Sequence, residues 1–288
     1  MSEFEANLTT GIANGAFAAT AFFLCTALLA VVAQTAPVEI IYGSAPPDID
    51  NHLLHLVKSY PDWLDRIDAG HLVLKTGERF AISDGVSSKT FNEILEKPDI
   101  DDMFYVPYPI GTTPKQPAKN SDPGRVRFEP LFNAMYGNCK KNEVAKKLKI
   151  IDWLPNHSGG HVAVTTVNGV DRALSRVSQE LDDLTADLVK FALHPAGTYN
   201  CRAIAGSTAR SMHAYGSAID VNVNYSDYWR WGTPTAKEPV WKNHIPIEIV
   251  RIFERHGFIW GGYWYHYDTM HFEYRPELLP DMGSPRPD

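Results

Sequence analysis

Two short segments hold the residue types that bind metal ions. The first, Ser211–Asp220, places His213 before a glycine turn and Asp220 on the polar side of an alternating run. Glycine adopts backbone conformations that allow a sharp turn, so the two side chains can converge. The second segment, Asp268–Glu273, contains His271 between two carboxylates. A histidine and a carboxylate three residues apart suit a metal ligand and a nearby base.

Two histidines and one carboxylate, with a fourth position left for water, form the ligand set of a catalytic zinc site. Imidazole nitrogen and carboxylate oxygen together suit zinc better than calcium or magnesium. We therefore predict one Zn2+ ion bound by His213, Asp220 and His271. The chain has 11 histidines, so spacing alone is weak evidence. Apolar strand residues around Asp220 and the aromatic and glycine run Trp260–Trp264 favour a built cleft over a solvated surface.

The elements that must position these residues follow from hydrophobic periodicity. Residues 217–224 alternate between apolar and polar and predict a strand, and residues 268–274 predict a final strand. Residues 168–181 carry one apolar stripe and predict a helix that packs on the core. The other expected elements are helices at 52–58, 128–136 and 247–255, a hairpin at 71–82, and strands at 150–154, 161–166 and 197–202. The predicted fold class is α+β, with a small, mostly antiparallel sheet flanked by helices and an N-terminal extension.

The N-terminus carries no charged residue from Ala6 to Val38. Its apolar core, residues 16–33, has no polar face, which favours an export signal cleaved near Ala33. A membrane anchor is the alternative, because the run is long enough to span a bilayer, and a buried helix is the third. Positive residues before the run are missing, so flanking charge gives no orientation.

Composition limits the classes of function. A hydrophobic fraction of 44% is enough for a core, and a net charge of -7 argues against nucleic acid as the main partner. Residues 107–124 contain five prolines and two glycines, which predicts an extended loop. We place a boundary there and expect three parts: 1–36 as export signal or anchor, 37–125 as an N-terminal extension, and 126–288 as the main domain. The loop could equally lie within one domain.

Three cysteines are present, and Cys25 lies in the apolar run. Cys139 and Cys201 would remain after processing, and in an oxidising compartment two remaining cysteines favour one disulfide. Two unrelated thiols are the alternative. Neither residue has a second cysteine or a histidine at ligand spacing, which argues against a cysteine-based metal site.

The motifs Ser-x-His-x-x-Gly-x-Ala-x-Asp, Trp-Gly-Gly-x-Trp and Asp-x-Met-His-Phe-Glu together resemble a known family. This is the VanY-type zinc D,D-carboxypeptidase and L-alanyl-D-glutamate endopeptidase family, which acts on the peptides of bacterial cell walls and has a hedgehog-like zinc fold. The resemblance is strong over residues 199–274 and weak over 128–196. It implies the same three zinc ligands, Asp268 as general base and acid, and Arg202 as the group that steadies the carbonyl oxygen.

Two departures from the family pattern bear on substrate and mechanism. The carboxylate before the last histidine is Asp268, as in the endopeptidase-like branch, where many carboxypeptidases have glutamate. The segment around Arg202 also differs from the common Gly-Tyr-Arg-Ser, which leaves Arg210 as a second choice. We expect Ser211, Tyr215 and Trp264 to contact the substrate. Residues 225–241, with Tyr228-Trp-Arg-Trp231 among them, either line the cleft or pack on the core.

Two kinds of function are compatible with these motifs. The first is an exported or membrane-anchored metallopeptidase, periplasmic or extracellular, that cuts peptidoglycan peptides as a carboxypeptidase or an endopeptidase. The second is a non-catalytic, zinc-stabilised module that binds the cell wall. The presence of Asp268 and a candidate arginine favours the enzyme. A membrane-anchored structural protein would account for the N-terminus but not for the two motifs.

Overall fold

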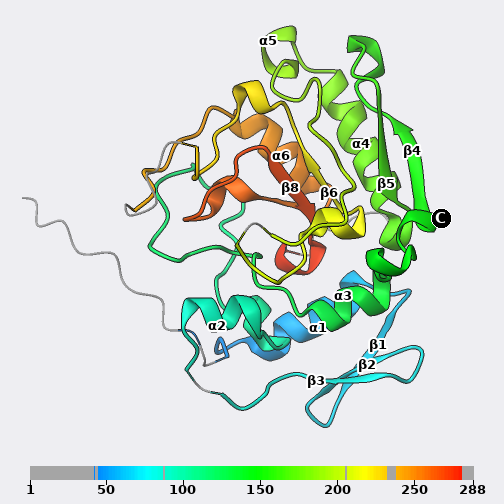
Figure 1. Cartoon of the computed structure of the whole chain (residues 1–288), viewed down its shortest axis with the longest axis vertical. Coiled ribbons are helices and arrows are strands. Elements are labelled where there is room, and N and C mark those ends of the chain that lie inside the picture. The colour runs from blue at the N-terminus through cyan, green and yellow to red at the C-terminus, as the bar shows by residue number, and fades with distance from the viewer. Residues whose placement is uncertain (1–41, 43–44, 87, 205, 232–237, 281–288) are drawn as a thin grey trace, which may run out of the picture. The chain divides into compact units, whose positions relative to one another are not determined.

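The segment that carries Asp220 pairs with the segment that carries His271. Strand β6 (Ala218–Asp220) lies antiparallel to β8 (His271–Tyr274), and β7 (Phe258–Trp260) pairs with the other edge of β8. Because β8 is the central strand, its residues are fixed by backbone hydrogen bonds on both sides. Figure 1 shows β6 and β8 inside the molecule, with α4, β4 and β5 to one side of them.

The computed structural model describes residues 42, 45–86, 88–204, 206–231 and 238–280. The chain divides into two compact units, Met1–Ala36 and Pro37–Asp288, and every described residue belongs to the second. The predicted export signal or anchor at 1–36 lies outside the described residues. In the part of the chain that is described, no helix is long and apolar enough to cross a membrane.

Helices and small sheets alternate along the described chain. The helices are α1 (Ile49–Ser59), α2 (Phe91–Glu96), α3 (Glu129–Tyr136), α4 (Val170–Asp182), α5 (Ala186–Val189) and α6 (Ile247–Arg255). The remaining strands are β1 (Leu64–Asp68), β2 (His71–Leu74), β3 (Arg79–Ala81), β4 (Leu148–Asp152) and β5 (His161–Thr165). They form an antiparallel β1-β2-β3 sheet and an antiparallel β4-β5 pair. The predicted α+β class is therefore confirmed.

One hydrophobic cluster joins both sides of the proline-rich loop at 107–124. It contains Leu56 and Tyr60 from the N-terminal segment together with core residues of α3, α4, α6 and β8. Behind the site, Phe253 of α6 stacks on Phe272 of β8 with ring centroids 3.8 Å apart. Since successive strand residues point to opposite faces, Phe272 anchors β8 in the core while its neighbour His271 faces the other way.

Several expected elements are present, and two differ. The helix expected at 168–181 is α4, and its predicted apolar stripe is buried. The strand expected at 217–224 ends at Asp220, because the Asn222 side chain accepts a hydrogen bond from Asn224 N at 3.1 Å and starts a 3-10 turn. The strand expected at 197–202 is absent. Only Gly197 forms an isolated bridge, opposite Asp220.

Candidate metal centre and catalytic cavity

Asp220 and His271 are direct cross-strand partners. In the register of β6 and β8, Asp220 lies opposite His271. Side chains at such a pair project from the same face of the sheet within contact distance. Asp220 Oδ1 lies 3.0 Å from His271 Nδ1. Strand pairing therefore brings together two candidate ligands that are 51 residues apart in the sequence.

His213 reaches the same point from a 3-10 turn, Met212–Tyr215. Ser211 caps this turn by accepting a hydrogen bond from His213 N at 3.4 Å. Gly216 ends it in the left-handed region at φ 67°, where a Cβ atom would also lie 2.7 Å from Leu148. The predicted glycine turn is thus confirmed. It places His213 Nε2 3.1 Å from Asp220 Oδ1 and 3.1 Å from His271 Nδ1.

The hydrogen bonds behind the two histidines fix which nitrogen atoms carry protons. His213 Nδ1 lies 2.8 Å from the Thr198 carbonyl oxygen, which can only accept, so Nδ1 is the donor. His271 Nε2 lies 2.8 Å from Glu273 Oε2. Burial raises the pKa of Glu273, but Arg127 and His271 outweigh this effect and hold it well below its usual range. Glu273 is thus a carboxylate that accepts a hydrogen bond from His271 Nε2–H.

The three facing atoms are therefore all electron-pair donors. His213 Nε2 and His271 Nδ1 present lone pairs to each other and to the Asp220 carboxylate. Such a triangle of acceptors is repulsive unless a proton or a cation lies between its members. Hydrogen bonds from each ligand histidine to a carbonyl or carboxylate are also the usual support of metal sites. The residues present fit a metal ion.

A buried network extends from Glu273 toward the N-terminal segment. Arg127 and Arg275 both bind Glu273, and Arg275 also binds Glu277. Glu277 in turn accepts a hydrogen bond from the Tyr60 hydroxyl at 2.5 Å. The Arg275, Glu273 and Glu277 side chains are almost completely buried. Charged groups of opposite sign therefore support His271 from behind, through residues on both sides of the proline-rich loop.

Asp268 lies in the same cavity, three residues before His271. Its Oδ1 atom is buried and has no hydrogen-bond partner within the described residues. Burial raises the pKa of Asp268 to about 7, with the Asp220 charge adding to the rise. Its backbone packs tightly, because a Cβ on Gly261 would lie 2.6 Å from the Asp268 carbonyl oxygen. An unpaired carboxylate with a pKa near neutrality suits proton transfer.

The candidate ligands open onto a cavity of about 340 Å³. Its lining includes the expected residues Arg202, Ser211 and Trp264. The Trp264 ring lies 5.5 Å from that of His271, between centroids. Of the predicted segment 225–241, Tyr228, Trp229 and Trp231 line the cavity, and residues 232–237 lie outside the described residues.

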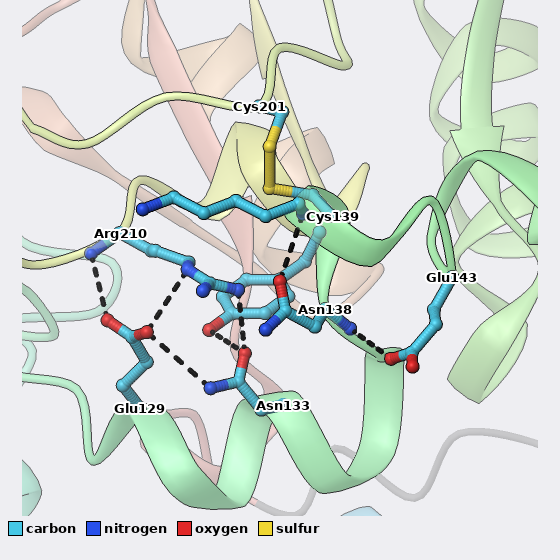
Figure 2. The surroundings of a disulfide bond; sticks show 9 residues. Glu129, Asn133, Asn138, Cys139, Glu143, Cys201 and Arg210 are labelled. Atoms are coloured by element: carbon cyan, nitrogen blue, oxygen red, sulfur yellow. Dashed lines mark hydrogen bonds and ion pairs between the residues drawn. A yellow bond between two sulfur atoms is a disulfide. The ribbon is translucent and has the colours of Figure 1, made fainter.

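Two other candidates lie elsewhere. Tyr215 is buried, donates its hydroxyl to Asn133 at 3.1 Å, and is not among the described residues that line the cavity. Arg210, the second choice for the arginine, pairs with Glu129 and Asn133 of α3 (Figure 2). Of the two arginines, Arg202 is therefore the one that lines the cavity.

A disulfide joins Cys139 to Cys201, the residue next to Arg202 (Figure 2). Cys139 is buried beside α3, whereas Cys201 is exposed. The Arg202 side chain is exposed and has no carboxylate partner among the described residues. The cross-link therefore ties the start of the Arg202 segment to the core and leaves the guanidinium available.

Sequence reasoning missed the contribution of the segment just before residue 126. Arg125 and Arg127 line the cavity, and Asp122 binds both Arg125 and His266. Nothing in their spacing relates these residues to His271, from which they are more than 140 positions distant in the chain. Only the observation that two arginines follow a proline-rich loop could have drawn attention to them.

A second acidic group, Asp99, Asp101 and Asp102, also has closely spaced oxygen atoms. Lys89 Nζ already lies 2.6 Å from Asp102 and 3.2 Å from Asp99. The lysine ammonium supplies the positive charge that this group requires. It contrasts with the His213 triangle, whose members lack such a partner among the described residues.

Comparison with known protein families places this site in context. Residues 205–274 match the family model described as D-alanyl-D-alanine carboxypeptidase. The predicted VanY-type resemblance is thus confirmed. The matched segment contains the three candidate ligands and Asp268, while Arg202 and the N-terminal segment lie outside it. Searches of curated proteins and of solved structures found no match. The VanY-like match supports a peptidase role of the D-alanyl-D-alanine carboxypeptidase kind.

Proposed function

We propose that this chain is a zinc metallopeptidase that hydrolyses peptide bonds in the stem peptides of bacterial peptidoglycan. The observation that carries the proposal is the triangle of His213, Asp220 and His271 beside the unpaired oxygen of Asp268. The family match over residues 205–274 supports the same reaction class.

Zinc fits the donor set better than other common divalent ions. Zinc bonds to histidine and carboxylate are about 2.0–2.2 Å long, which puts tetrahedral donors roughly 3.4 Å apart. The three donor atoms here lie 3.0–3.1 Å apart, slightly closer than this spacing. Two imidazoles and one carboxylate leave a fourth position for water or substrate, as catalytic zinc sites require.

The side chains around the centre account for the remaining chemistry. When bound, zinc supplies a Lewis acid that acidifies water and polarises a carbonyl group. Asp268 can take a proton from the attacking water at its free oxygen and deliver it to the leaving amine. Arg202, which has no carboxylate partner among the described residues, can stabilise the oxygen of the scissile carbonyl as it becomes negative. Trp264 and the tryptophans at 229 and 231 provide apolar walls that limit water around the peptide.

We extend the proposal to the location of the protein. Export through the segment 1–36, as a signal or an anchor, would bring the chain to the periplasm or the outside of the cell, where peptidoglycan lies. A disulfide between Cys139 and Cys201 supports this location, because disulfides persist in oxidising compartments.

The test combines metal analysis with product identification. The purified chain should bind one zinc ion, and incubation with muropeptides should release either free D-Ala or a fragment cut between L-Ala and D-Glu, identified by mass. His213→Ala should abolish zinc binding and hydrolysis. His161→Ala, at an exposed histidine of β5, is the matched control and should retain both. Bound zinc without any product would favour the non-catalytic module.

A further inference from the structure

Arg125 and Arg202 are far apart in the sequence. Both nevertheless line the cavity that contains Asp268. Both arginines act electrostatically on Asp268, where they oppose the rise in its pKa. Burial raises the pKa of Tyr228, another residue of the lining, and both arginines oppose that rise as well. Two positive groups from distant segments therefore converge on the space next to the candidate base.

The Arg125 side chain is held in a defined position. Its Nη1 lies 3.1 Å from Asp122 Oδ2, and its guanidinium carbon lies 5.9 Å from the centre of the Trp264 ring. Asp122 also binds His266 through both the backbone nitrogen at 3.0 Å and Nδ1 at 2.8 Å. With three donors, Asp122 is largely satisfied. Arginine carries five N–H donors, and within the described residues the Arg125 guanidinium donates to Asp122 alone, which leaves donors for a ligand.

The charges of the cavity leave an excess of positive groups for a ligand. Arg127 is neutralised by Glu273, and Asp220 faces the two histidines. The other charged residues of the lining are Arg125, Arg202 and Asp268. Arg125 shares the Asp122 carboxylate with His266, so Asp122 does not compensate both of them fully. A metal ion at the triangle would add further positive charge. A planar guanidinium fork pairs most strongly with a carboxylate, through two parallel hydrogen bonds.

We propose that Arg125, in the same cavity as Arg202, provides a subsite for a carboxylate group of the peptide substrate. This inference rests on the proposed peptidase function and goes beyond it, because it makes a residue outside the matched segment 205–274 determine specificity. A stem peptide offers this chemistry in two places. One is the terminal carboxylate of D-Ala, next to the bond that a carboxypeptidase cuts. The other is the α-carboxylate of D-Glu, next to the bond that an L-Ala–D-Glu endopeptidase cuts.

The first experiment changes the substrate and leaves the protein intact. The zinc-loaded full chain is given a stem pentapeptide with both carboxylates free, the same peptide with a C-terminal amide, and the same peptide with D-isoglutamine in place of D-Glu. We expect one amidated peptide to show a kcat/KM lower by roughly 10- to 100-fold, as for a lost charge-assisted pair. Loss with the C-terminal amide identifies the terminal carboxylate, and loss with D-isoglutamine identifies the glutamyl one. Equal kcat/KM for all three peptides would overturn the subsite.

The second experiment changes Arg125. Arg125→Gln should remove most of the preference for the free carboxylate, while Arg125→Lys should retain part of it. Arg66→Gln, at an exposed arginine of β1, is the matched control and should leave the preference unchanged. If Arg125→Gln slows all three peptides by the same factor with zinc still bound, Arg125 has no role in carboxylate recognition.

A binding measurement separates this inference from the proposed function. The Asp268→Asn chain with zinc is titrated with the same three peptides, so that affinity is measured without turnover. Tighter binding of the free carboxylate, together with no hydrolysis by the wild-type chain, would reject the peptidase function and keep the subsite. Hydrolysis by the wild-type chain with equal affinities for acid and amide would keep the function and reject the subsite.

Discussion

Glu273 accepts a hydrogen bond from Nε2 of His271, two residues earlier on the same strand, at 2.8 Å. Residues two apart in a strand share a face, so β8 itself provides both the candidate ligand and its support. Arg127 and Arg275 hold Glu273 from the other side in a fully buried setting. Through this bond, the orientation of His271 depends on a network that reaches Tyr60 in the N-terminal segment.

Glu273→Gln should weaken both metal binding and folding. The change keeps the shape but removes the charge that fixes the His271 tautomer, so zinc affinity should fall by roughly 10- to 100-fold. It also leaves Arg127 and Arg275 with less compensation, at a cost of about 3–5 kcal/mol in unfolding free energy. Zinc competition with a chelator and thermal unfolding measure the two effects. Glu248→Gln, at a charge in the first turn of α6, is the control, and unchanged zinc affinity in Glu273→Gln would contradict the assigned role.

Tyr60→Phe tests the far end of the same network. The change removes one hydrogen bond to Glu277, whose other oxygen still binds Arg275. We expect a loss of roughly 1–3 kcal/mol in unfolding free energy, because a buried acceptor loses its donor. Zinc affinity should change much less than in Glu273→Gln, since His271 and Glu273 keep their contact. A zinc affinity reduced as strongly as in that variant would show that the network acts as one unit.

The ligand motif around the glycine turn could be predicted from the sequence, because residues close together in the chain determine its geometry. His213 and Asp220 are seven residues apart on either side of a glycine turn, and the turn alone brings them together. His271 required one long-range step, the pairing of β6 with β8, which two predicted strands with ligands on them made plausible. Helix α6 was predicted at its observed limits since its apolar residues recur at helical spacing.

The buried hydrogen-bond network that supports the site could not be predicted from the sequence, and the reason is physical. Tyr60 and Glu277 are 217 residues apart and join through a single hydrogen bond between buried side chains. Such a contact leaves no periodicity in the sequence. The segment 197–202 misled the prediction since its apolar and polar residues resemble a strand. In the structure Asn200 N bonds to the His213 carbonyl oxygen at 3.1 Å and Arg202 N to Asn200 O at 2.8 Å, so no ladder forms.

Asp268→Asn should separate catalysis from metal binding. Asparagine keeps the size of the side chain but cannot accept a proton at neutral pH, so kcat should fall by roughly 10²- to 10⁴-fold. Zinc content should stay at the wild-type level because Asp268 is not one of the three converging ligands. Hydrolysis of muropeptides and metal analysis provide the two readouts. Wild-type kcat in this variant would rule out Asp268 as the proton-transfer group.

Removal of the metal should make stability depend on pH. Burial lowers the pKa of His271, but its hydrogen bonds to Asp220 and Glu273 outweigh this and raise it from 6.5 to about 9 in the metal-free protein. Because the pKa of His271 is higher in the folded than in the unfolded chain, protonation of His271 stabilises the fold. This contribution is complete below pH 6.5 and is lost as the pH rises to about 9. A metal ion takes the place of that proton, so the zinc form should not show the same loss.

Thermal unfolding with and without a chelator, across this pH range, measures the difference. The Tm gap between the two forms should widen with rising pH. In His271→Ala the metal-free protein should lose this trend, because the titrating group is absent. A gap that stays constant from pH 6.5 to 9 in the wild-type chain would contradict the proposed exchange of proton and metal.

The disulfide should matter for activity more than for metal binding. The double variant Cys139→Ser with Cys201→Ser removes a link across 62 residues, which should cost about 2–4 kcal/mol in unfolding free energy. Release of Cys201 also frees the neighbouring Arg202, and a displaced catalytic group lowers kcat/KM, here by roughly tenfold or more. The ligands should still bind zinc, since the Thr198 and Glu273 contacts that orient the histidines do not involve the cysteines. Loss of zinc together with activity in the double variant would show instead that the disulfide holds the metal centre itself.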